Sequence, residues 1–304
     1  MTERARAIAE FLTKAGWGGA ERRHLAADAS FRRYERLWRD GESRVLMDAP
    51  PPRENVGAFD RVARTLIDLG LSAPRALAVD EAAGLMLLED FGDRTFTRAL
   101  AEDVDEASLY RLAIDSLIAL HQRWQPVPEA ALPLYDNARL LDEAMLLSDW
   151  FLPALRGAPT PEPVREAYTE AWRAVLDRVR AGPDCLVLRD YHVDNLMLLE
   201  GREGVAACGL LDFQDAVIGP VTYDVVSLLE DARRDIDTGV TVEMLARYLD
   251  AFPTLDRERF MESYAVLGAQ RAAKIVGIFT RLSRRDEKDH YLHHIPREIG
   301  RAHV

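Results

Sequence analysis

The chain has 304 residues, 48% of them hydrophobic and 30% charged, an ordinary globular balance with enough length for a sizeable core. Its 39 Lys and Arg residues against 51 Asp and Glu residues give a formal net charge of −12, which argues against broad binding to nucleic acids or to anionic membranes. Residues 1–14 lack the uninterrupted apolar core of a secretory signal, and no apolar run reaches membrane-spanning length, so we expect a cytoplasmic protein.

The N-terminal third begins with a predicted hairpin and a predicted helix. Residues 33–38 and 43–47 are strand-like, and the Asp-Gly pair at positions 40 and 41 between them is a strong hairpin signal. After three prolines, apolar residues recur at helical spacing over residues 56–67, and Gly70 marks the predicted end of this helix.

A second predicted hairpin is followed by a change from strand-like to helical sequence. Strands at 75–79 and 85–88 flank a polar turn, and the apolar run stops at Glu89-Asp90-Phe91-Gly92. Beyond this joint, helical periodicity dominates. The predicted helices span residues 105–122, 137–151, 162–181, 224–233 and 258–282.

A small island of strand-like sequence interrupts the helical part. Three short apolar runs, 186–188, 196–199 and 207–211, are each bounded by polar residues or glycine. Cys185 and Cys208 lie in or beside these runs, where we expect reduced, buried thiols. A sheet-rich first third, a joint and a helical remainder predict a two-lobed protein that binds its ligand in a cleft between the lobes.

The loops of this island hold the residues best suited to chemistry. Asp190 and Asn195 lie in a polar loop between two apolar runs, and the third run delivers Asp212. Phosphoryl transfer needs a carboxylate that orients an attacking hydroxyl and accepts its proton, together with hard oxygen ligands that hold Mg²⁺. Turn residues capping short strands would also explain each residue singly, but the joint spacing favours the chemical interpretation.

The order of these residues resembles a known catalytic pattern. An Asp-x-x-x-x-Asn loop at 190–195, followed by a strand-borne Asp-Phe at 212–213, resembles the catalytic loop and metal-binding segment of kinases. The continuation over residues 214–224 resembles the aminoglycoside phosphotransferase and choline kinase group, and the resemblance covers nearly the whole chain. It implies a protein-kinase-like α+β fold, with a small β-rich N-lobe at 1–90 and a large helical C-lobe at 91–304.

Two further segments look like one branch of that group. Asp-Ala-Ser-Phe-Arg-Arg-Tyr at 28–34 and Met-Asp-Ala-Pro-Pro at 47–51 are similar to the bacterial anomeric kinases of N-acetylmuramate and N-acetylglucosamine, which serve peptidoglycan recycling. This resemblance implies an ATP- and Mg²⁺-dependent kinase with a small amino-sugar substrate. It leaves the oligomeric state open.

The resemblance also assigns roles position by position. Asp190 matches the catalytic base, and Asn195 and Asp212 match the Mg²⁺ ligands. The remaining matches concern ATP: Glu89, Asp90 and Phe91 match the linker that hydrogen-bonds adenine, Met197 matches the apolar floor beneath it, and Ser30 and Arg32 belong to the loop over the phosphates.

The chain departs from the kinase pattern at the phosphate-binding end. Its loop at 28–34 has no Gly-x-Gly-x-x-Gly, and the strand that normally carries an ATP-clamping lysine reads Arg-Val-Leu-Met-Asp at 44–48. Arg32, Arg33 or Arg44 could supply the missing cation. Because side chains alternate along a strand, the sequence alone does not settle which of them faces the ligand.

Several other residues have both a structural and a functional interpretation. His192 and Asp194 share the catalytic loop and Asp215 follows Asp212, so each either shapes its loop or lies near the substrate. For Asp224, which opens an apolar helix after Gly-Pro, capping of that helix is the simpler interpretation.

Two candidates for the acceptor site lie further away in the sequence. Gln270, Arg271 and Lys274 form either a solvated helix face or a pocket in which Arg and Lys bind the lactyl carboxylate of N-acetylmuramate. Trp150 either stacks on a sugar ring or packs in the core.

Two other functions remain open from the sequence. The first is a kinase for another acceptor, such as an aminoglycoside, choline or homoserine, since an acidic chain suits cationic acceptors. The second is a nucleotide-binding regulatory module with weak catalysis, which the missing strand lysine supports and the intact Asp190, Asn195 and Asp212 oppose.

Overall fold

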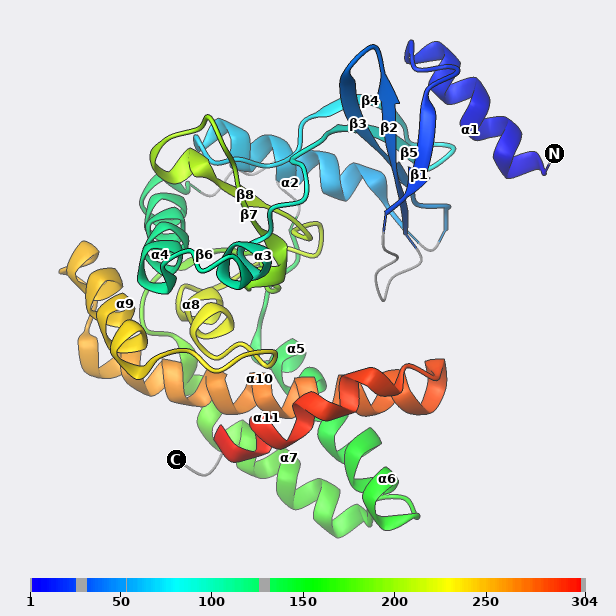
Figure 1. Ribbon diagram of the computed structural model, residues 1–304. Helices are drawn as coiled ribbons and strands as arrows, with labels where there is room; N and C mark the ends of the chain where they lie inside the picture. Colours follow the sequence, from blue (N-terminus) through cyan, green and yellow to red (C-terminus); the bar gives the residue numbers. More distant parts are fainter. Residues whose placement is uncertain (1, 26–31, 53, 126–131, 302–304) are drawn as a thin grey trace. The chain divides into compact units, whose positions relative to one another are not determined.

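The computed structural model describes residues 2–25, 32–52, 54–125 and 132–301, which belong to two compact units (Figure 1). The first unit joins residues 1–104 to 194–215, and the second joins 105–193 to 216–304. The strand island is therefore divided between the two units. The lobe boundary expected from the sequence near residue 90 stays a prediction.

The first unit is built on a five-stranded antiparallel sheet in the order β1-β2-β3-β5-β4. Both predicted hairpins are confirmed, and Asp40 and Gly41 adopt positive φ angles of 53° and 81°, as a tight hairpin turn requires. The sequence does not reveal β1, because Glu-Arg-Arg-His has no apolar alternation. The strands are β1 (Glu21–His24), β2 (Arg33–Arg39), β3 (Glu42–Asp48), β4 (Ala76–Asp80) and β5 (Leu85–Glu89).

Helix α1 (Glu3–Lys14) covers one face of this sheet. Ile8 and Phe11 of the helix belong to one buried cluster with Leu37, Leu46 and Leu87 of the sheet. Leu46 lies directly opposite Leu87 in the strand register, so these apolar residues share a face. Side chains of the alternate positions point to the other face, which α1 leaves uncovered.

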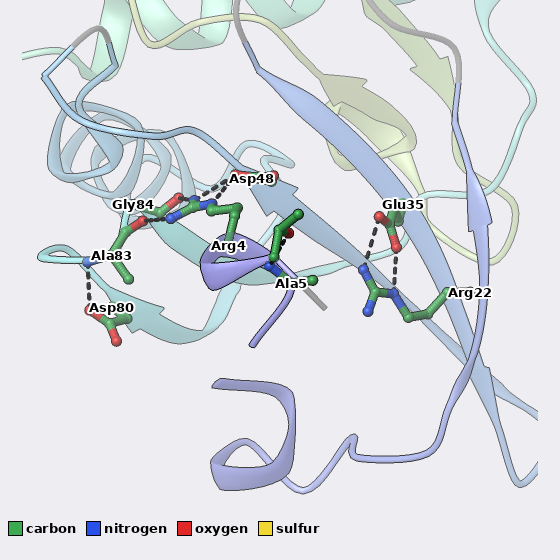
Figure 2. Close-up of polar contacts among 9 residues, drawn as sticks. Arg4, Ala5, Arg22, Glu35, Asp48, Asp80, Ala83 and Gly84 are labelled. Atoms are coloured by element: carbon green, nitrogen blue, oxygen red, sulfur yellow. Dashed lines mark hydrogen bonds and ion pairs between the residues drawn. The ribbon is translucent and has the colours of Figure 1, made fainter. Parts of the chain in front are cut away.

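A single arginine ties the start of α1 to the sheet (Figure 2). Arg4 forms an ion pair of 2.5 Å with Asp48, the last residue of β3, and donates to the carbonyl oxygens of Ala83 and Gly84 before β5. Gly84 has a φ of 63°, and a side chain there would meet the Ala49 carbonyl at 2.2 Å, so the turn requires glycine.

The predicted helix after the prolines is α2 (Val56–Asp68), which is capped by Asn55 and ends before Gly70 in a left-handed conformation. The short helix α3 (Phe96–Ala101) and the antiparallel pair β7 (Leu196–Leu198) and β8 (Cys208–Leu210) complete the first unit. Backbone hydrogen bonds from this pair to Arg94 and Ser72 attach it to the N-terminal part of the unit.

The second unit is mainly helical, and its predicted helices are confirmed with changed bounds. The predicted helix at 137–151 is divided, because a π-helical turn (η1, Leu147–Phe151) follows α5. The sequence does not reveal β9 (Val217–Pro220), which ends in Gly-Pro and pairs with β6 (Asp184–Val187). The helices are α4 (Glu106–Arg123), α5 (Asn137–Ala144), α6 (Leu152–Arg156), α7 (Glu162–Leu176), α8 (Thr222–Leu229), α9 (Thr238–Ala251), α10 (Arg257–Asp286) and α11 (Ile295–Arg301).

The long helix α10 is the structural centre of the second unit. It packs against α8, α5 and the π-helical turn. A side chain at Gly277 would meet the Leu146 backbone at 2.4 Å, so glycine permits this close approach. Cys185 and Cys208 are buried and form no disulfide within the described part of the chain, as expected. Among the helices that the structure describes, none is both long and apolar enough to cross a membrane.

Candidate active site

The first unit contains a cavity of about 390 Å³. Val45 and Leu88 line it from the sheet face opposite α1, and Met197 and Leu211 line it from the β7–β8 pair. Residues 89–92 also line it, so the predicted Glu89, Asp90, Phe91 and Met197 do line one cavity. Apolar walls with a backbone edge suit a planar heterocycle.

Arg36 of β2 holds the segment Glu89–Asp93, called the linker below. Its guanidinium pairs with Asp90 at 2.8 Å and with Asp93 at 2.7 Å, and it donates to the Gly92 carbonyl oxygen at 2.8 Å. The side chains of Arg36 and Asp90 are 10% and 3% exposed, so their charge-assisted pair lies largely out of water, whereas Asp93 is exposed. The cavity edge is therefore fixed from the sheet side.

Arg202, in the loop between β7 and β8, holds the same linker from the other side. It forms an ion pair with Glu89, donates to the Ser72 hydroxyl at 2.8 Å and lies 5.1 Å from the Phe91 ring centre. Neither arginine is recognisable in the sequence, because their partners are 54 to 130 residues away.

The two residues predicted to hold Mg²⁺, Asn195 and Asp212, line this same cavity. Asp212 has a φ of 56°, a conformation uncommon outside glycine that clusters at functional sites, and Gln214 donates to its Oδ1 at 2.8 Å. An amide and a carboxylate oxygen are donors that fit Mg²⁺. In the described ranges no group of three or more His, Cys, Asp or Glu residues could hold a metal, so phosphate oxygens and water would have to complete the coordination.

Arg32 lies beside the proposed metal ligand. Its Nη1 is 3.6 Å from Asp212 Oδ1, its Nε is 3.4 Å from Glu54, and its Nη2 is 3.9 Å from Asp215. The side chain of Asp215 is 61% exposed, whereas that of Arg32 is 9% exposed. Ser30, the other residue predicted to cover phosphates, lies outside the described residues.

In the second unit, Asp224 holds the backbone that presents Asp190. The Asp224 carboxylate accepts from the Leu188 N–H at 2.6 Å and from the Arg189 N–H at 2.9 Å. Arg189 has a φ of 71°, a conformation that needs such support outside glycine. The prediction that Asp224 caps a helix is wrong, because the N-cap of α8 is Val221 and Asp224 lies within the helix.

A buried group of charges lies around the same loop. The Glu143 carboxylate pairs with Lys274 at 3.1 Å, forms an ion pair with Arg189 and accepts from the Tyr135 hydroxyl. Lys274 also lies 3.2 Å from the Tyr223 hydroxyl. Both oxygens of Glu143 are thus engaged, and the Lys274 ammonium is held by protein groups.

The interpretation of α10 as a solvated face at this point is wrong. Gln270, Arg271 and Lys274 are only 0%, 4% and 7% exposed. Gln270 donates to the Leu140 carbonyl oxygen at 2.9 Å. Nη1 of Arg271 is buried and has no hydrogen-bond partner among the described residues. Of the two predicted acceptor-site cations, Arg271 therefore retains a donor that a ligand could use.

The charges around Asp190 set its protonation state. Burial would raise the pKa of Asp190, but the positive charge of Lys274, with those of Arg189 and Arg271, outweighs burial and holds this pKa below its usual value. Burial lowers the pKa of His192 to about 4. Near neutral pH, Asp190 is therefore an ionised carboxylate that can accept a proton, and the His192 ring is neutral.

Asp224 differs from Asp190 in its protonation. Burial raises the pKa of Asp224 to about 7, although its bonds from the Leu188 and Arg189 N–H groups act in the opposite direction. The carboxyl group that accepts from the Leu188 and Arg189 N–H groups therefore titrates near neutral pH.

Two predicted acceptor-site residues have local roles. Trp150 lies half-buried in the π-helical turn η1, a kind of turn that is frequent at functional sites. Asp194 belongs to the first unit, where its carboxylate accepts from the Thr97 hydroxyl. Their contact with an acceptor stays a prediction.

The chain is similar in sequence to known phosphate-transferring enzymes. Residues 21–261 match the model of the phosphotransferase enzyme family. This chain belongs to that family. The phosphotransferase is 37% identical to the N-acetylmuramate/N-acetylglucosamine kinase of Caulobacter vibrioides, with 97% of this chain and 90% of the relative covered. It is 39% identical to the kinase of the same name from Pseudomonas aeruginosa, with 95% of this chain and 86% of the relative covered.

Solved structures confirm the expected fold class. Choline kinase LicA from Streptococcus pneumoniae matches the phosphotransferase with a TM-score of 0.69 at 13% identity, covering 99% of both chains. The ADP-bound aminoglycoside phosphotransferase APH(2'')-Ib matches with a TM-score of 0.66 at 14% identity, covering 99% of this chain and 97% of the other. The protein is therefore an α+β protein with the fold of these kinases.

Proposed function

We propose that this phosphotransferase transfers the γ-phosphate of ATP to the anomeric hydroxyl of N-acetylmuramate or N-acetylglucosamine, in the cytoplasm. The observation that carries this proposal is the 37% and 39% identity, over at least 95% of the chain, to kinases named for these two sugars. The choline kinase and aminoglycoside phosphotransferase structures share only 13% and 14% identity with it, and they support the fold alone.

The cavity of the first unit is the proposed nucleotide site. Adenine would lie between Val45, Leu88 and Met197, with its polar edge toward the backbone of the linker. Asn195 and Asp212 would hold Mg²⁺ at the other end of this cavity. When bound, the cation neutralises charge on the transferring phosphoryl group.

The second unit supplies the acceptor side of the proposal. Asp190, ionised near neutral pH, would orient the anomeric hydroxyl and accept its proton. Arg271 would bind the lactyl carboxylate of N-acetylmuramate through its buried Nη1, since Lys274 is held by Glu143. His192 and Trp150 of this unit, and Asp194 and Asp215 of the first unit, remain further candidates for contact with the sugar.

The test is an acceptor screen with purified protein, ATP and Mg²⁺. N-acetylmuramate, N-acetylglucosamine, choline, homoserine and an aminoglycoside are supplied separately, and ³¹P NMR identifies the phosphorylated position. We expect phosphate on C1 of both sugars, and Asp190→Asn should lower this turnover by about 10²- to 10⁴-fold. Phosphate on another acceptor but on neither sugar refutes the proposed acceptor. Nucleotide binding without turnover of any acceptor favours a regulatory module.

A further inference from the structure

Strand β3 presents no basic residue to the nucleotide cavity. Val45 lines the cavity, and Met47, two residues further along, lies on the same face. Arg44 lies on the opposite face, where its guanidinium is 5.3 Å from the Trp17 ring centre. The strand that carries the phosphate-clamping lysine in related kinases therefore offers a thioether here, and Arg44 is excluded as its replacement.

Strand β2 offers arginines on the cavity face instead. Tyr34 and Arg36 line the cavity from one face of β2. Arg32 directly precedes this strand, and its Nη1 lies 3.6 Å from Asp212, which also lines the cavity. Arg33 points to the other face and is exposed. Arg36 is bound to the linker at the adenine end, and Arg32, directly before β2, is the arginine beside Asp212 at the metal end.

The contacts of Arg32 agree with this placement. Its guanidinium lies 3.6 Å from Asp212, and Glu54 lies 3.4 Å from its Nε. A cation this close to a magnesium ligand is within reach of the phosphate oxygens that the same Mg²⁺ would bind. The planar fork of an arginine can bind two phosphate oxygens at once, whereas a lysine acts as a point charge.

We propose that Arg32 binds the terminal phosphates of the nucleotide in place of the missing strand lysine, with Glu54 fixing the orientation of its guanidinium. The inference rests on the proposed use of ATP, but it does not depend on the acceptor. It assigns a phosphate-specific role to a residue directly before β2, and it leaves adenine binding to the linker and the apolar walls.

The experiment measures nucleotide binding in the absence of acceptor. Dissociation constants for ATP, ADP and adenosine are determined by isothermal titration calorimetry, with Mg²⁺ and again with EDTA. The variants are Arg32→Met, Arg32→Lys and, as a matched control at the next position along the chain, Arg33→Met. Circular dichroism and thermal melting check that each variant is folded.

We expect Arg32→Met to weaken ATP and ADP binding by about 10- to 100-fold while adenosine binding stays unchanged. Arg32→Lys should recover part of this loss of affinity, and Arg33→Met should bind like the wild type. The loss in Arg32→Met should persist in EDTA, because Arg32 contacts the phosphates directly and not through Mg²⁺. An equal loss for adenosine, no loss for ADP, or a loss that vanishes in EDTA overturns the assignment.

The same data separate this inference from the proposed function. If the wild type binds ADP and Arg32→Met loses that binding, the assignment of Arg32 stands even when the acceptor screen finds no phosphorylated sugar. If the wild type binds adenosine and ADP equally well, no phosphate site exists, and both the assignment of Arg32 and the proposed kinase activity are refuted.

Discussion

Turnover by this phosphotransferase should respond to the titration of Asp224 near pH 7. As a carboxylate, Asp224 accepts from the Leu188 and Arg189 N–H groups with its two oxygens. Burial raises its pKa to about 7, so protonation as the pH falls converts one of those oxygens into a hydroxyl. One N–H of the segment that presents Asp190 then loses its acceptor, and the position of Asp190 becomes less fixed.

The groups that face Asp224 keep constant charge over the same pH range. The pKa of Asp190 is lowered and that of Arg271 raised, so both stay ionised. Burial raises the pKa of Cys185 to about 12 and that of Tyr248 well above its usual value, so both stay neutral. With a pKa of about 7, the ionised fraction of Asp224 rises from about 0.1 at pH 6 to about 0.9 at pH 8, which predicts a change in kcat of about tenfold.

The variant Asp224→Asn tests this reasoning. It keeps one oxygen acceptor and cannot titrate, so kcat should be reduced but nearly constant from pH 6 to pH 8. ADP release is measured by chromatography, because a coupled assay would add its own pH dependence. If Asp224→Asn shows the same tenfold rise as the wild type, another group titrates and the assignment is wrong.

The titration of Asp224 should also affect the stability of the fold, but in the opposite direction: turnover rises with pH, whereas stability falls. The folded pKa of Asp224, about 7, lies above the ordinary aspartate value of 3.8, so the folded state binds more protons than the unfolded state between these two pH values. This group therefore makes the folded protein less stable as the pH rises from about 4 to about 7. Urea unfolding at several pH values should show this decrease in the free energy of unfolding for the wild type and not for Asp224→Asn.

Three further predictions concern the second unit. Glu143→Gln should lower the free energy of unfolding, measured by urea titration, by about 3–5 kcal/mol, because Lys274 and Arg189 lose their buried counter-charge. A decrease below about 1 kcal/mol would contradict the stabilising role of Glu143. Burial lowers the pKa of His121 to about 4, below its unfolded value, so the free energy of unfolding of the wild type should fall by about 2 kcal/mol between pH 7 and pH 5 because of this group. The variant His121→Asn should lack this decrease, and equal pH dependence of unfolding in the two proteins would exclude His121 as its source. Arg271→Gln should raise KM for N-acetylmuramate about 10-fold or more and leave KM for N-acetylglucosamine nearly unchanged; equal effects on both sugars would contradict carboxylate binding.

The sequence predicts those parts of the site whose signal is local. The hairpin around Asp40 and Gly41 and the helix ending before Gly70 are confirmed because turn residues and apolar periodicity act over a few positions. Asn195, Asp212 and Met197 are brought to one cavity because short strands deliver them at fixed spacing.

The sequence fails where a partner lies far along the chain. Asp224 looks like a helix cap, but its acceptor oxygens serve N–H groups 35 and 36 residues earlier. Lys274 looks like part of a solvated face, because the carboxylate that neutralises it, Glu143, belongs to another helix. Charged residues on a long helix carry no local sign of such burial, so helical periodicity alone misplaces them.

The electrostatic potential at Asp190 also bears on whether the acceptor is a cation or carries negative charge, which the net charge of the chain leaves open. A formal charge of −12 suits a cationic acceptor such as choline or an aminoglycoside. Yet Asp190 is half-buried and its pKa is still lowered, which requires a net positive potential at this carboxylate, with Lys274 as its largest source. Such a potential opposes a cationic acceptor and favours one that carries an anion or develops negative charge on its hydroxyl oxygen. The local arrangement of buried charges, rather than the composition of the chain, therefore favours N-acetylmuramate over choline.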